Sequence, residues 1–357
     1  MFFRNEVKNI LITGGAGFIG GTLINKLLKD KNIKIHNIDY MGYASNELLI
    51  EKFKKYTKNY FHHQINLSDI NSINSVIKNS DPDLIIHLAA ESHVDRSLNS
   101  PQDFIQSNII GTFNLLKESL IHYQNLSEKR KSIFRFHHIS TDEVFGSLGE
   151  FGQFDENSSY DPRSPYSASK ASSDHLVRTW NYSFKLPTLI TNCSNNYGPF
   201  QFPEKLIPLT ILKAIKKEII PVYGNGENIR DWIHVDDHIE GIICVASKGK
   251  SGKTYCIGGN SERTNIDIVK TICIHLDKII PKKGGSYLTQ IEFVKDRPGH
   301  DYRYSINSNL IKKELGWEPK IYFEEGLKNT IEWYIQNQSW TDNLTNRSGY
   351  NYERLGL

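Results

Sequence analysis

The strongest constraint on the fold is the alternation of short apolar runs with amphipathic segments through the first 195 residues. In the apolar runs hydrophobic residues stand side by side, which is typical of strands buried on both faces of a sheet. These runs occupy residues 7–15, 33–40, 83–90, 134–140 and 186–198. Segments with helical spacing lie at residues 21–30, 70–80, 108–123 and 164–184. The alternation predicts βαβ units, and therefore an α/β fold with a doubly wound (Rossmann) parallel sheet and helices on both faces.

The pattern changes after residue 194, where glycine and proline interrupt the chain at short intervals. The clearest examples are "NNYGPFQFPEK", "YGNGENIRDW", "CIGGN" and "KDRPGHD". Segments of this kind are loops, and their density favours a site built on them. We therefore expect a Rossmann domain over residues 1–194 and a smaller mixed α/β substrate domain over residues 195–357, with some segments interleaved between the two.

Composition places the chain among ordinary globular proteins, with 38% hydrophobic residues. A net charge of +3 is too small to indicate binding to nucleic acid or to an anionic membrane. No apolar run reaches the length of about 18 residues that a transmembrane helix needs. The first ten residues lack the apolar core of a signal peptide, and the four cysteines are widely separated, so we expect reduced thiols and a cytoplasmic protein. The histidines show no ligand spacing, and no metal is expected.

The segment "TGGAGFIG" lies at the turn from the first predicted strand to the first predicted helix. It places Gly14, Gly17 and Gly20 where a tight turn lets the backbone approach a pyrophosphate, which the helix N-terminus attracts. Asp39 closes the second predicted strand, where a carboxylate hydrogen-bonds a ribose 2′-hydroxyl and repels a 2′-phosphate. The first domain is therefore predicted to bind NAD in preference to NADP. A glycine turn followed by a solvated aspartate is the alternative.

A tyrosine and a lysine, Tyr166 and Lys170, lie four residues apart in the helical segment 164–184. This spacing puts both side chains on one face of the helix. An ammonium group beside a phenol lowers the pKa of the phenol, so the pair predicts a base that works near neutral pH. The same spacing occurs on ordinary surface helices, and the dinucleotide motif upstream is what favours the catalytic interpretation.

Two adjacent acids, Asp142 and Glu143, follow the predicted strand 134–140. Neighbouring carboxylates repel each other, and burial opposes their ionisation. The pair predicts either a surface turn or an acid and a base that act on one small molecule, because repulsion and burial push the two pKa values apart.

Several motifs together resemble those of the extended short-chain dehydrogenase/reductases: Gly14 to Gly20, "LAAESHVDRS", "STDEVFG" and "YSASK". Within that superfamily the chain is most similar to the nucleotide-sugar 4,6-dehydratases, since "SNNYGPFQFPEKLIP", "NIRDWIHVDDH" and "DRPGHDYRY" extend the likeness over nearly the whole chain. The resemblance implies a lyase of deoxysugar biosynthesis that removes water from a nucleotide sugar with tightly bound NAD. A dTDP-linked glucose is the expected substrate, with CDP- and UDP-linked sugars as alternatives.

The resemblance also implies roles for five residues, Thr141, Asp142, Glu143, Tyr166 and Lys170. Tyr166, beside Thr141, takes the proton of the sugar 4-hydroxyl while hydride passes from C4 to NAD. Glu143 removes the C5 proton that the new ketone acidifies, and Asp142 protonates the departing 6-hydroxyl. Hydride then returns to C6, so no external oxidant is consumed.

Further positions follow from the same motifs. Cofactor contacts are expected at Gly14, Gly17, Phe18, Ile19, Gly20, Asp39, Asn66, Leu67, Leu88, Ala89, Ala90, Ser92, Asn108, Thr112, Tyr166, Lys170 and Asn196. Substrate contacts are expected at Ser92, Thr141, Asn195, Glu204, Lys205, Leu206, Pro221, Val222, Tyr223, Arg230, Asn265, Asp296, Arg297, Pro298, Gly299 and His300. The arginines suit a diphosphate, because the planar guanidinium matches phosphate oxygens. The family pattern also implies a homodimer with a four-helix seam formed by residues 108–123 and 173–184.

The chain departs from the family pattern mainly at the adenosine end of the cofactor. Asn66 stands where an aspartate is usual, and the segment "YMGYASN" after Asp39 differs from the usual "LTYAGN". Phe145 stands where a tyrosine is usual, outside the implied proton transfers. Two other functions remain open, an epimerase or decarboxylase of the same superfamily and an NAD-binding protein without catalytic activity. The intact acid pair, tyrosine and lysine favour the dehydratase.

Overall fold

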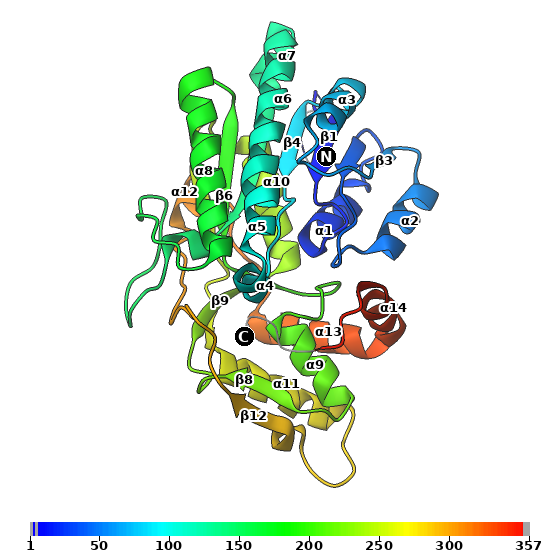
Figure 1. Cartoon of the computed structure of the whole chain (residues 1–357), viewed down its shortest axis with the longest axis vertical. Helices are drawn as coiled ribbons and strands as arrows, with labels where there is room; N and C mark the ends of the chain where they lie inside the picture. Colours follow the sequence, from blue (N-terminus) through cyan, green and yellow to red (C-terminus); the bar gives the residue numbers. More distant parts are fainter. Residues whose placement is uncertain (1–2, 4–5, 353–357) are drawn as a thin grey trace.

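The centre of the molecule is a seven-stranded sheet in which every pair of neighbouring strands is parallel. The structure is a computed structural model and describes residue 3 and residues 6–352. The sheet has the order β10-β6-β5-β4-β1-β2-β3 (Figure 1). Its strands are β1 (Asn9–Thr13), β2 (Lys34–Ile38), β3 (Tyr60–His63), β4 (Leu84–His87), β5 (Arg135–Thr141), β6 (Thr188–Cys193) and β10 (Thr254–Ile257). The predicted Rossmann sheet is confirmed.

Helices cover both faces of this sheet, as the apolar runs predict. Ile10 and Ile12 of β1 pack into one hydrophobic core, and Leu11 between them packs into another on the opposite face. The first core is closed by α1 (Phe18–Leu27), α2 (Glu47–Tyr56) and α10 (Val235–Lys248). The second is closed by α3 (Ile70–Ser80), α6 (Gly111–Asn125) and α8 (Pro165–Phe184).

The sequence defines the start of α8, the helix that carries Tyr166 and Lys170. Ser164 accepts a hydrogen bond from the backbone N–H of Ser167, and the Ser167 hydroxyl accepts one from the N–H of Ser164, which completes a capping box. Pro165 occupies the first turn, where its missing N–H costs no hydrogen bond. These local signals fix the register of the helix against β5 and β6.

A second lobe lies below the sheet in Figure 1 and has its own hydrophobic core. It contains a three-stranded sheet of β11 (Glu262–Thr264), β9 (Ile229–His234) and β7 (Asn195–Tyr197), and a parallel pair of β8 (Ile220–Tyr223) and β12 (Ile291–Val294). Its helices are α9 (Leu206–Ile215), α11 (Asn265–Ile279), α13 (Phe323–Gln336) and α14 (Gln338–Ser348). The short elements of the chain are α4 (Val94–Asn99), α5 (Pro101–Phe104), the π-helix η1 (Ile105–Ile110), α7 (Glu128–Ile133), the 3₁₀-helices η2 (Asp142–Phe145) and η3 (Tyr287–Gln290), and α12 (Asn309–Leu315).

Two features differ from the sequence-based expectation. α2 and β3 were not predicted, because β3 is an edge strand with a half-polar sequence and α2 is a short, lysine-rich helix. The run 186–198 is not one strand, since β6 joins the large sheet and β7 joins the small one. β10 returns from the second half of the chain to the large sheet. No helix in the described part of the chain is long and apolar enough to cross a membrane.

Candidate active site

The predicted site residues of the first domain gather at the carboxyl edge of the large sheet. Turns after β1, β2, β4, β5 and β6 all end there because the strands are parallel. In open α/β sheets this edge is where ligands bind. Its chemistry therefore depends on a few side chains from segments far apart in the sequence.

The turn between β1 and α1 is built for close approach of backbone to a ligand. Gly14 has a φ of +76°, and a Cβ there would lie 2.7 Å from the backbone nitrogen of Ala89. A Cβ on Gly20 would lie 2.3 Å from the carbonyl oxygen of Gly14, so this glycine lets the helix pack on the turn. Gly17 precedes the helix without a side-chain cap, which leaves the first N–H groups, those of Phe18 and Ile19 among them, to an anion. This turn fits the pyrophosphate of a dinucleotide.

Asp39 follows β2 and is buried at the same edge. Its Oδ2 accepts a hydrogen bond from the N–H of Ala16 at 2.9 Å, and its Oδ1 accepts one from the N–H of Met41 at 2.9 Å and one from the Ser45 hydroxyl at 3.2 Å. These bonds fix an anionic group beside the glycine turn. The carboxylate has the place and charge expected for a partner of the adenosine ribose.

Other predicted cofactor residues have side chains that already bind the protein. The side-chain amide of Asn108, buried in η1, donates to the Ser169 hydroxyl at 2.8 Å. The Thr112 hydroxyl donates to the backbone carbonyl oxygen of Asn108 at 2.6 Å. Asn196 lies 2.8 Å from His238 through its Oδ1. Leu88, Ala89, Ala90 and Ser92 form the turn after β4. Contacts from this group to a cofactor would come mainly through backbone and methyl groups.

The adenosine end is less enclosed than the glycine turn. Asn66 is exposed, and its Oδ1 accepts hydrogen bonds from the N–H and the hydroxyl of Ser68, both at 2.9 Å. The side chain of Leu67 packs into the hydrophobic core beneath α3 and α6. The side-chain oxygen of Asn66, which stands where the family usually has an aspartate, therefore stabilises a local turn, and the residue lies at the surface.

Tyr166 and Thr141 meet where α8 crosses the end of β5. Both side chains are buried. Burial, followed by the charge of Glu143, raises the pKa of Tyr166 well above its ordinary value, and a hydrogen bond with the Thr141 side chain opposes that rise. The pair therefore places two hydroxyl groups side by side in a dry pocket that also contains a carboxyl group.

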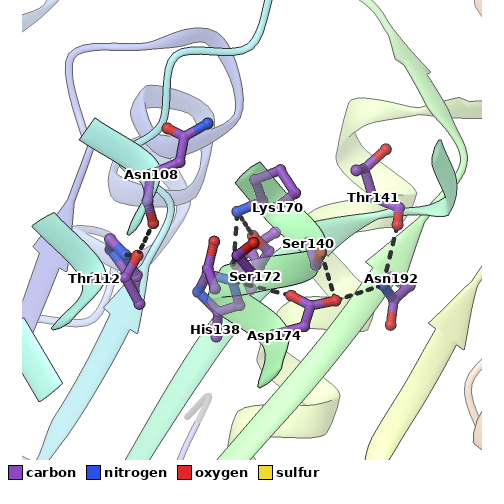
Figure 2. Close-up of polar contacts among 12 residues, drawn as sticks. Asn108, Thr112, His138, Ser140, Thr141, Lys170, Ser172, Asp174 and Asn192 are labelled. Carbon is purple, nitrogen blue, oxygen red and sulfur yellow. Dashed lines mark hydrogen bonds and ion pairs between the residues drawn. The ribbon is translucent and has the colours of Figure 1, made fainter. Parts of the chain in front are cut away.

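Lys170, which the sequence predicts to lower the pKa of Tyr166, has its own contacts on the strand behind the tyrosine. Its ammonium donates to the carbonyl oxygen of Ile139 at 2.8 Å and lies 3.4 Å from Nε2 of His138 (Figure 2). Burial lowers the pKa of Lys170 to about 8, so its charge depends on its surroundings. The lysine is turned toward the strand behind the tyrosine, because backbone and imidazole partners are available there.

The acid pair occupies η2, directly after β5. Thr141 caps this short helix by accepting a hydrogen bond from the N–H of Glu143 at 3.3 Å, and its hydroxyl donates to Oδ1 of Asp142 at 3.2 Å. Asp142 is 2% exposed, and its Oδ2 has no hydrogen-bond partner among the described residues. A surface turn, the alternative interpretation of this pair, does not fit a carboxyl group buried to this degree.

The two acids have different electrostatic surroundings. Burial first, and then the charges of Glu143 and Asp231, raise the pKa of Asp142 well above its usual range. Burial also raises the pKa of Glu143, but Arg297, Lys205 and Arg230 oppose that rise. The site therefore favours a protonated Asp142 beside a Glu143 that ionises more readily, which is the combination of an acid and a base.

The cations near Glu143 are Arg230 of β9, Arg297 in the loop after β12, and Lys205 directly before α9. Arg230 of β9 is buried and donates to the carbonyl oxygen of Asp301 at 2.9 Å. Arg297 forms an ion pair of 3.2 Å with Asp95, which also accepts a hydrogen bond of 2.8 Å from the Tyr223 hydroxyl. These contacts hold two guanidinium groups near Glu143, and the planar guanidinium suits phosphate oxygens.

The remaining predicted substrate residues differ in their surroundings. Glu204 is buried, and it accepts hydrogen bonds from the Tyr43 hydroxyl at 2.8 Å and from Arg96 at 3.0 Å. Val222 packs into the core of the second lobe, so its side chain does not face the site. The others lie along the loop edges or element ends of the second lobe: Asn195, Lys205, Leu206, Pro221, Asn265, Asp296, Pro298, Gly299 and His300. Of these, Asn195 has a buried side-chain oxygen without a partner among the described residues, which fits a polar ligand.

Sequence reasoning missed the polar residues behind Lys170. Asp174 lies 3.2 Å from His138 and accepts a hydrogen bond of 2.9 Å from the Ser140 hydroxyl. A signal was available, since Tyr166, Lys170 and Asp174 follow one another at intervals of four residues and so share one helical face. Among the described residues no group of three or more His, Cys, Asp or Glu side chains is placed to hold a metal ion.

This combination of a Rossmann sheet, a glycine turn and a Tyr-x-x-x-Lys helix defines the class of short-chain dehydrogenase/reductases. The sequence model of a family described as GDP-mannose 4,6 dehydratase matches residues 11–330. A protein of Escherichia coli named dTDP-glucose 4,6-dehydratase is 49% identical over 360 residues, which cover 98% of this chain and 99% of that protein. One of the same name from Neisseria meningitidis is 48% identical over 356 residues, with 98% and 99% covered. The chain therefore belongs to the GDP-mannose 4,6 dehydratase family, and the resemblance noted in the sequence is confirmed.

Solved structures agree with this assignment. The crystal structure of a dTDP-glucose 4,6-dehydratase from Bacillus anthracis in complex with NAD is similar at a TM-score of 0.82 and 39% identity, covering 94% of this chain and 99% of that one. A dTDP-glucose 4,6-dehydratase from Streptomyces venezuelae with NAD and TYD bound is similar at a TM-score of 0.85 and 36% identity, with the same coverage. The doubly wound fold is thus shared over nearly the whole chain.

Proposed function

We propose that the chain catalyses the 4,6-dehydration of dTDP-glucose to dTDP-4-dehydro-6-deoxy-glucose. It is an NAD-dependent hydro-lyase. The observation that carries the proposal is the acid pair beside Tyr166, in which a buried Asp142 favours its protonated form and Glu143 faces cations. Relatives that are 48–49% identical over nearly the whole chain have the corresponding name.

NAD, when bound, accepts a hydride from C4 of the sugar and later returns it to C6. The chain holds this cofactor with the turn from Gly14 to Gly20 around the pyrophosphate and with Asp39 at the adenosine ribose. The fixed carboxylate of Asp39, bound by the N–H of Ala16, supports selection of NAD over NADP, since a 2′-phosphate would meet a negative charge.

The protein moves four protons in the proposed cycle. Tyr166, as a phenolate aligned by Thr141, takes the proton of the 4-hydroxyl as that carbon is oxidised. Glu143 takes the proton of C5, which the ketone at C4 has made acidic, and Asp142 gives a proton to the 6-hydroxyl, which leaves as water. When hydride returns to C6, Glu143 gives its proton back to C5, and the proton that Tyr166 gained restores Asp142 through solvent. The buried setting of Asp142 supports its role, because a carboxyl group that stays protonated at neutral pH can act as an acid.

The nucleotide is assigned to the second lobe. Arg230 and Arg297 would bind the diphosphate, and the segment from Pro221 to Tyr223 with the loop from Asp296 to His300 would border the nucleoside. Both arginines are anchored by protein contacts, which supports a preformed site. CDP-glucose and UDP-glucose would undergo the same sugar chemistry, so the base is the part of the substrate that needs a direct test.

A turnover assay tests the function. The purified chain with dTDP-glucose is expected to form a 4-keto product, detected by its absorbance in alkali and by loss of the 6-hydroxymethyl signal in NMR. Parallel reactions with CDP- and UDP-glucose at equal concentration are expected to be slower. Formation of a C4 epimer without loss of water would establish an epimerase instead. Tight NAD binding without turnover of any of the three substrates would establish a binding protein.

We also propose that two copies of the chain form a homodimer through α6 and α8. Large apolar side chains are exposed on these two helices and on η1, which leads into α6: Ile110, Phe113, Ile121, Tyr182 and Phe184. Exposed apolar surface of this extent is typical of an interface. The molar mass of wild type by light scattering is expected to be twice that of the chain, and Phe113→Glu is expected to shift it toward the monomer. A monomeric wild type would contradict the dimer.

The domain division and the cellular location are proposals of the same kind. We assign residues 1–194 to an NAD-binding domain and residues 195–357 to a nucleotide-sugar domain, with β10 and α10 as the segments that cross back to the large sheet. The four cysteines are unpaired in the structure, which supports a cytoplasmic location.

A further inference from the structure

A cluster of polar side chains is buried behind Lys170, on the side away from the acid pair. The Asp174 cluster consists of Asp174 on α8, His138 and Ser140 on β5, Asn192 on β6 and Tyr160 in the loop before α8 (Figure 2 shows all but Tyr160). Asp174 is fully buried. Its Oδ2 accepts hydrogen bonds from Tyr160 at 2.6 Å, Ser140 at 2.9 Å and Asn192 at 3.2 Å.

These donors keep Asp174 ionised although it is dry. Burial alone would raise its pKa, but His138, Lys170 and the hydroxyl of Tyr160 together bring the pKa below the ordinary value. Hydrogen bonds from neutral donors stabilise the charged form of a carboxyl group. The cluster therefore contains a fixed negative charge, which none of the proposed proton transfers uses.

Lys170 is the cation that faces this charge. Its ammonium lies 3.4 Å from Nε2 of His138, and the same nitrogen lies 3.2 Å from Oδ1 of Asp174. Burial lowers the pKa of Lys170 to about 8, and Asp174 is the group that opposes this fall most. Without a counter-charge, a buried ammonium loses its proton easily.

The other titratable groups around Lys170 do not supply that charge. Cys193 of β6 would raise the pKa of Lys170 as a thiolate, but burial raises its own pKa to about 12, so it is a neutral thiol at pH 7. Burial and Lys170 lower the pKa of His138 to about 4, and His87 of β4 is likewise shifted well below its usual value, so both imidazoles are neutral. Burial raises the pKa of Tyr166 on α8, so in the absence of NAD its phenol supplies no negative charge to Lys170 either.

We propose that Asp174 is the buried counter-ion of Lys170, acting across the neutral imidazole of His138, and that it positions and keeps the positive charge on which Tyr166 depends as a base. The proposal rests on the proposed function for the part played by Tyr166. Nε2 of His138 can donate to Asp174 or accept from Lys170, but it cannot do both at once. In either case the imidazole ring, and not water, occupies the space between the two charges. Asp174 is thus a positioning residue, since it acts through Lys170.

The direct test follows the ionisation of Lys170 by NMR in holoenzyme labelled with ¹⁵N-lysine, with the Nζ signal assigned by its loss in Lys170→Arg. In Asp174→Asn the titration of Lys170 is expected to move down by about one pH unit or more. In the plot of kcat against pH, the fall of kcat on the alkaline side is expected to shift to lower pH by the same amount, so that activity is recovered at lower pH. Ser140→Ala is the matched control, because it removes one donor and keeps the charge, and it is expected to titrate as wild type does. An unchanged Lys170 titration in folded Asp174→Asn would overturn the proposal.

A second test is made on wild type and does not need Asp174→Asn to fold. In ¹³C-aspartate-labelled enzyme the Asp174 carboxyl signal, assigned with Asp174→Glu, is expected to be that of a carboxylate throughout pH 6–8, while Lys170 remains charged at pH 7. A protonated Asp174 or a neutral Lys170 at pH 7 would overturn the proposal. Both NMR readouts are independent of turnover, so a failure of the dehydratase assignment would leave them valid.

Discussion

Two buried aspartates near the end of β5 show how neighbouring regions of one molecule reach opposite protonation states. Asp142 is 2% exposed and Asp174 is 0% exposed, so both have lost their water. One oxygen of Asp142 has no partner among the described residues, and its pKa is raised well above the ordinary value. Asp174 also has one oxygen without a hydrogen-bond partner in the described part of the chain, Oδ1, which lies 3.2 Å from Nε2 of His138, but its Oδ2 accepts three hydrogen bonds, and its pKa is lowered. Burial is common to both, so their neighbours decide the difference: the charges of Glu143 and Asp231 act on Asp142, whereas His138, Lys170 and the Tyr160 hydroxyl act on Asp174.

The comparison assigns the two regions different tasks. A dry carboxyl group with few donors keeps its proton and can give it to a leaving hydroxyl. A dry carboxylate surrounded by donors keeps its charge and can stabilise a cation. Both environments adjoin the end of one strand, because Thr141 caps η2, which carries Asp142, and the preceding Ser140 donates to Asp174 of α8.

The largest expected effect is the loss of turnover when the acid pair is neutralised. Asp142→Asn and Glu143→Gln keep size and hydrogen bonding but remove the acid and the base, and each is expected to lower kcat roughly a hundred- to ten-thousand-fold. Oxidation at C4 precedes both steps, so NADH absorbance is expected to rise on mixing with substrate. Normal turnover in both variants would show that the pair is structural.

Heavy water distinguishes the roles within the pair. Asp142→Asn retains the base and is expected to exchange the C5 hydrogen for deuterium, whereas Glu143→Gln is expected to exchange it slowly. Mass spectrometry of recovered nucleotide sugar measures the exchange. The opposite pattern would mean that the two roles are reversed.

Removal of the charge in the second region is expected to cost stability. Asp174→Asn leaves Lys170 buried without its counter-ion, and the free energy of unfolding is expected to fall by about 3–5 kcal/mol at pH 7. The pKa of Asp174 is lower in the folded protein than in the unfolded chain, where it is about 4. The ionised carboxylate therefore stabilises the fold above about pH 4, and this stabilisation is lost as pH falls through the pKa of the folded state. The deficit is therefore expected to shrink in acid. Urea denaturation at fixed protein and NAD concentrations measures it, and a deficit that is the same at pH 7 and pH 3.5 would argue for lost packing alone.

Asp142→Asn is expected to change stability in the opposite direction. Because the pKa of Asp142 is higher in the folded protein than in the unfolded chain, its carboxyl group lowers the free energy of unfolding more and more as pH rises above about 4. Removal of this carboxyl is therefore expected to stabilise the protein by about 1–2 kcal/mol at pH 7. The gain is expected to disappear below pH 4, where both states are protonated. The same urea experiment applies. A destabilised Asp142→Asn at neutral pH would remove the contrast between the two aspartates.

The smallest effect is expected for the second acid of the pair. Glu143→Gln removes a carboxyl whose raised pKa is opposed by Arg297, Lys205 and Arg230, so its stabilisation at pH 7 is expected to be below that of Asp142→Asn, at about 0.5 kcal/mol. Comparison of the two urea midpoints in one buffer measures this. A larger gain from Glu143→Gln would mean that the cations do not screen Glu143.

Much of the fold and of the cofactor edge was predictable because it depends on local patterns. Apolar runs located β1, β2, β4 and β5, and a Ser-Pro start located α8 to within one residue. The edge strand β3 was missed because an edge needs no continuous apolar run, and the short, lysine-rich α2 was missed as well. The split of β6 from β7 was missed because both have strand-like sequences and only their pairing partners differ.

The sequence by itself determined the glycine turn, the carboxylate after β2, the Tyr-x-x-x-Lys helix and the adjacent acids, because each is a matter of residue type at fixed spacing. The tertiary structure decided which groups surround them. It turned Lys170 toward Ile139 and His138, left Asp142 with few donors, and brought Tyr160, Ser140 and Asn192 onto Asp174. Protonation states follow from such contacts between distant segments, since the pKa of a buried group depends on solvent exclusion and on donors that the neighbouring sequence does not contain.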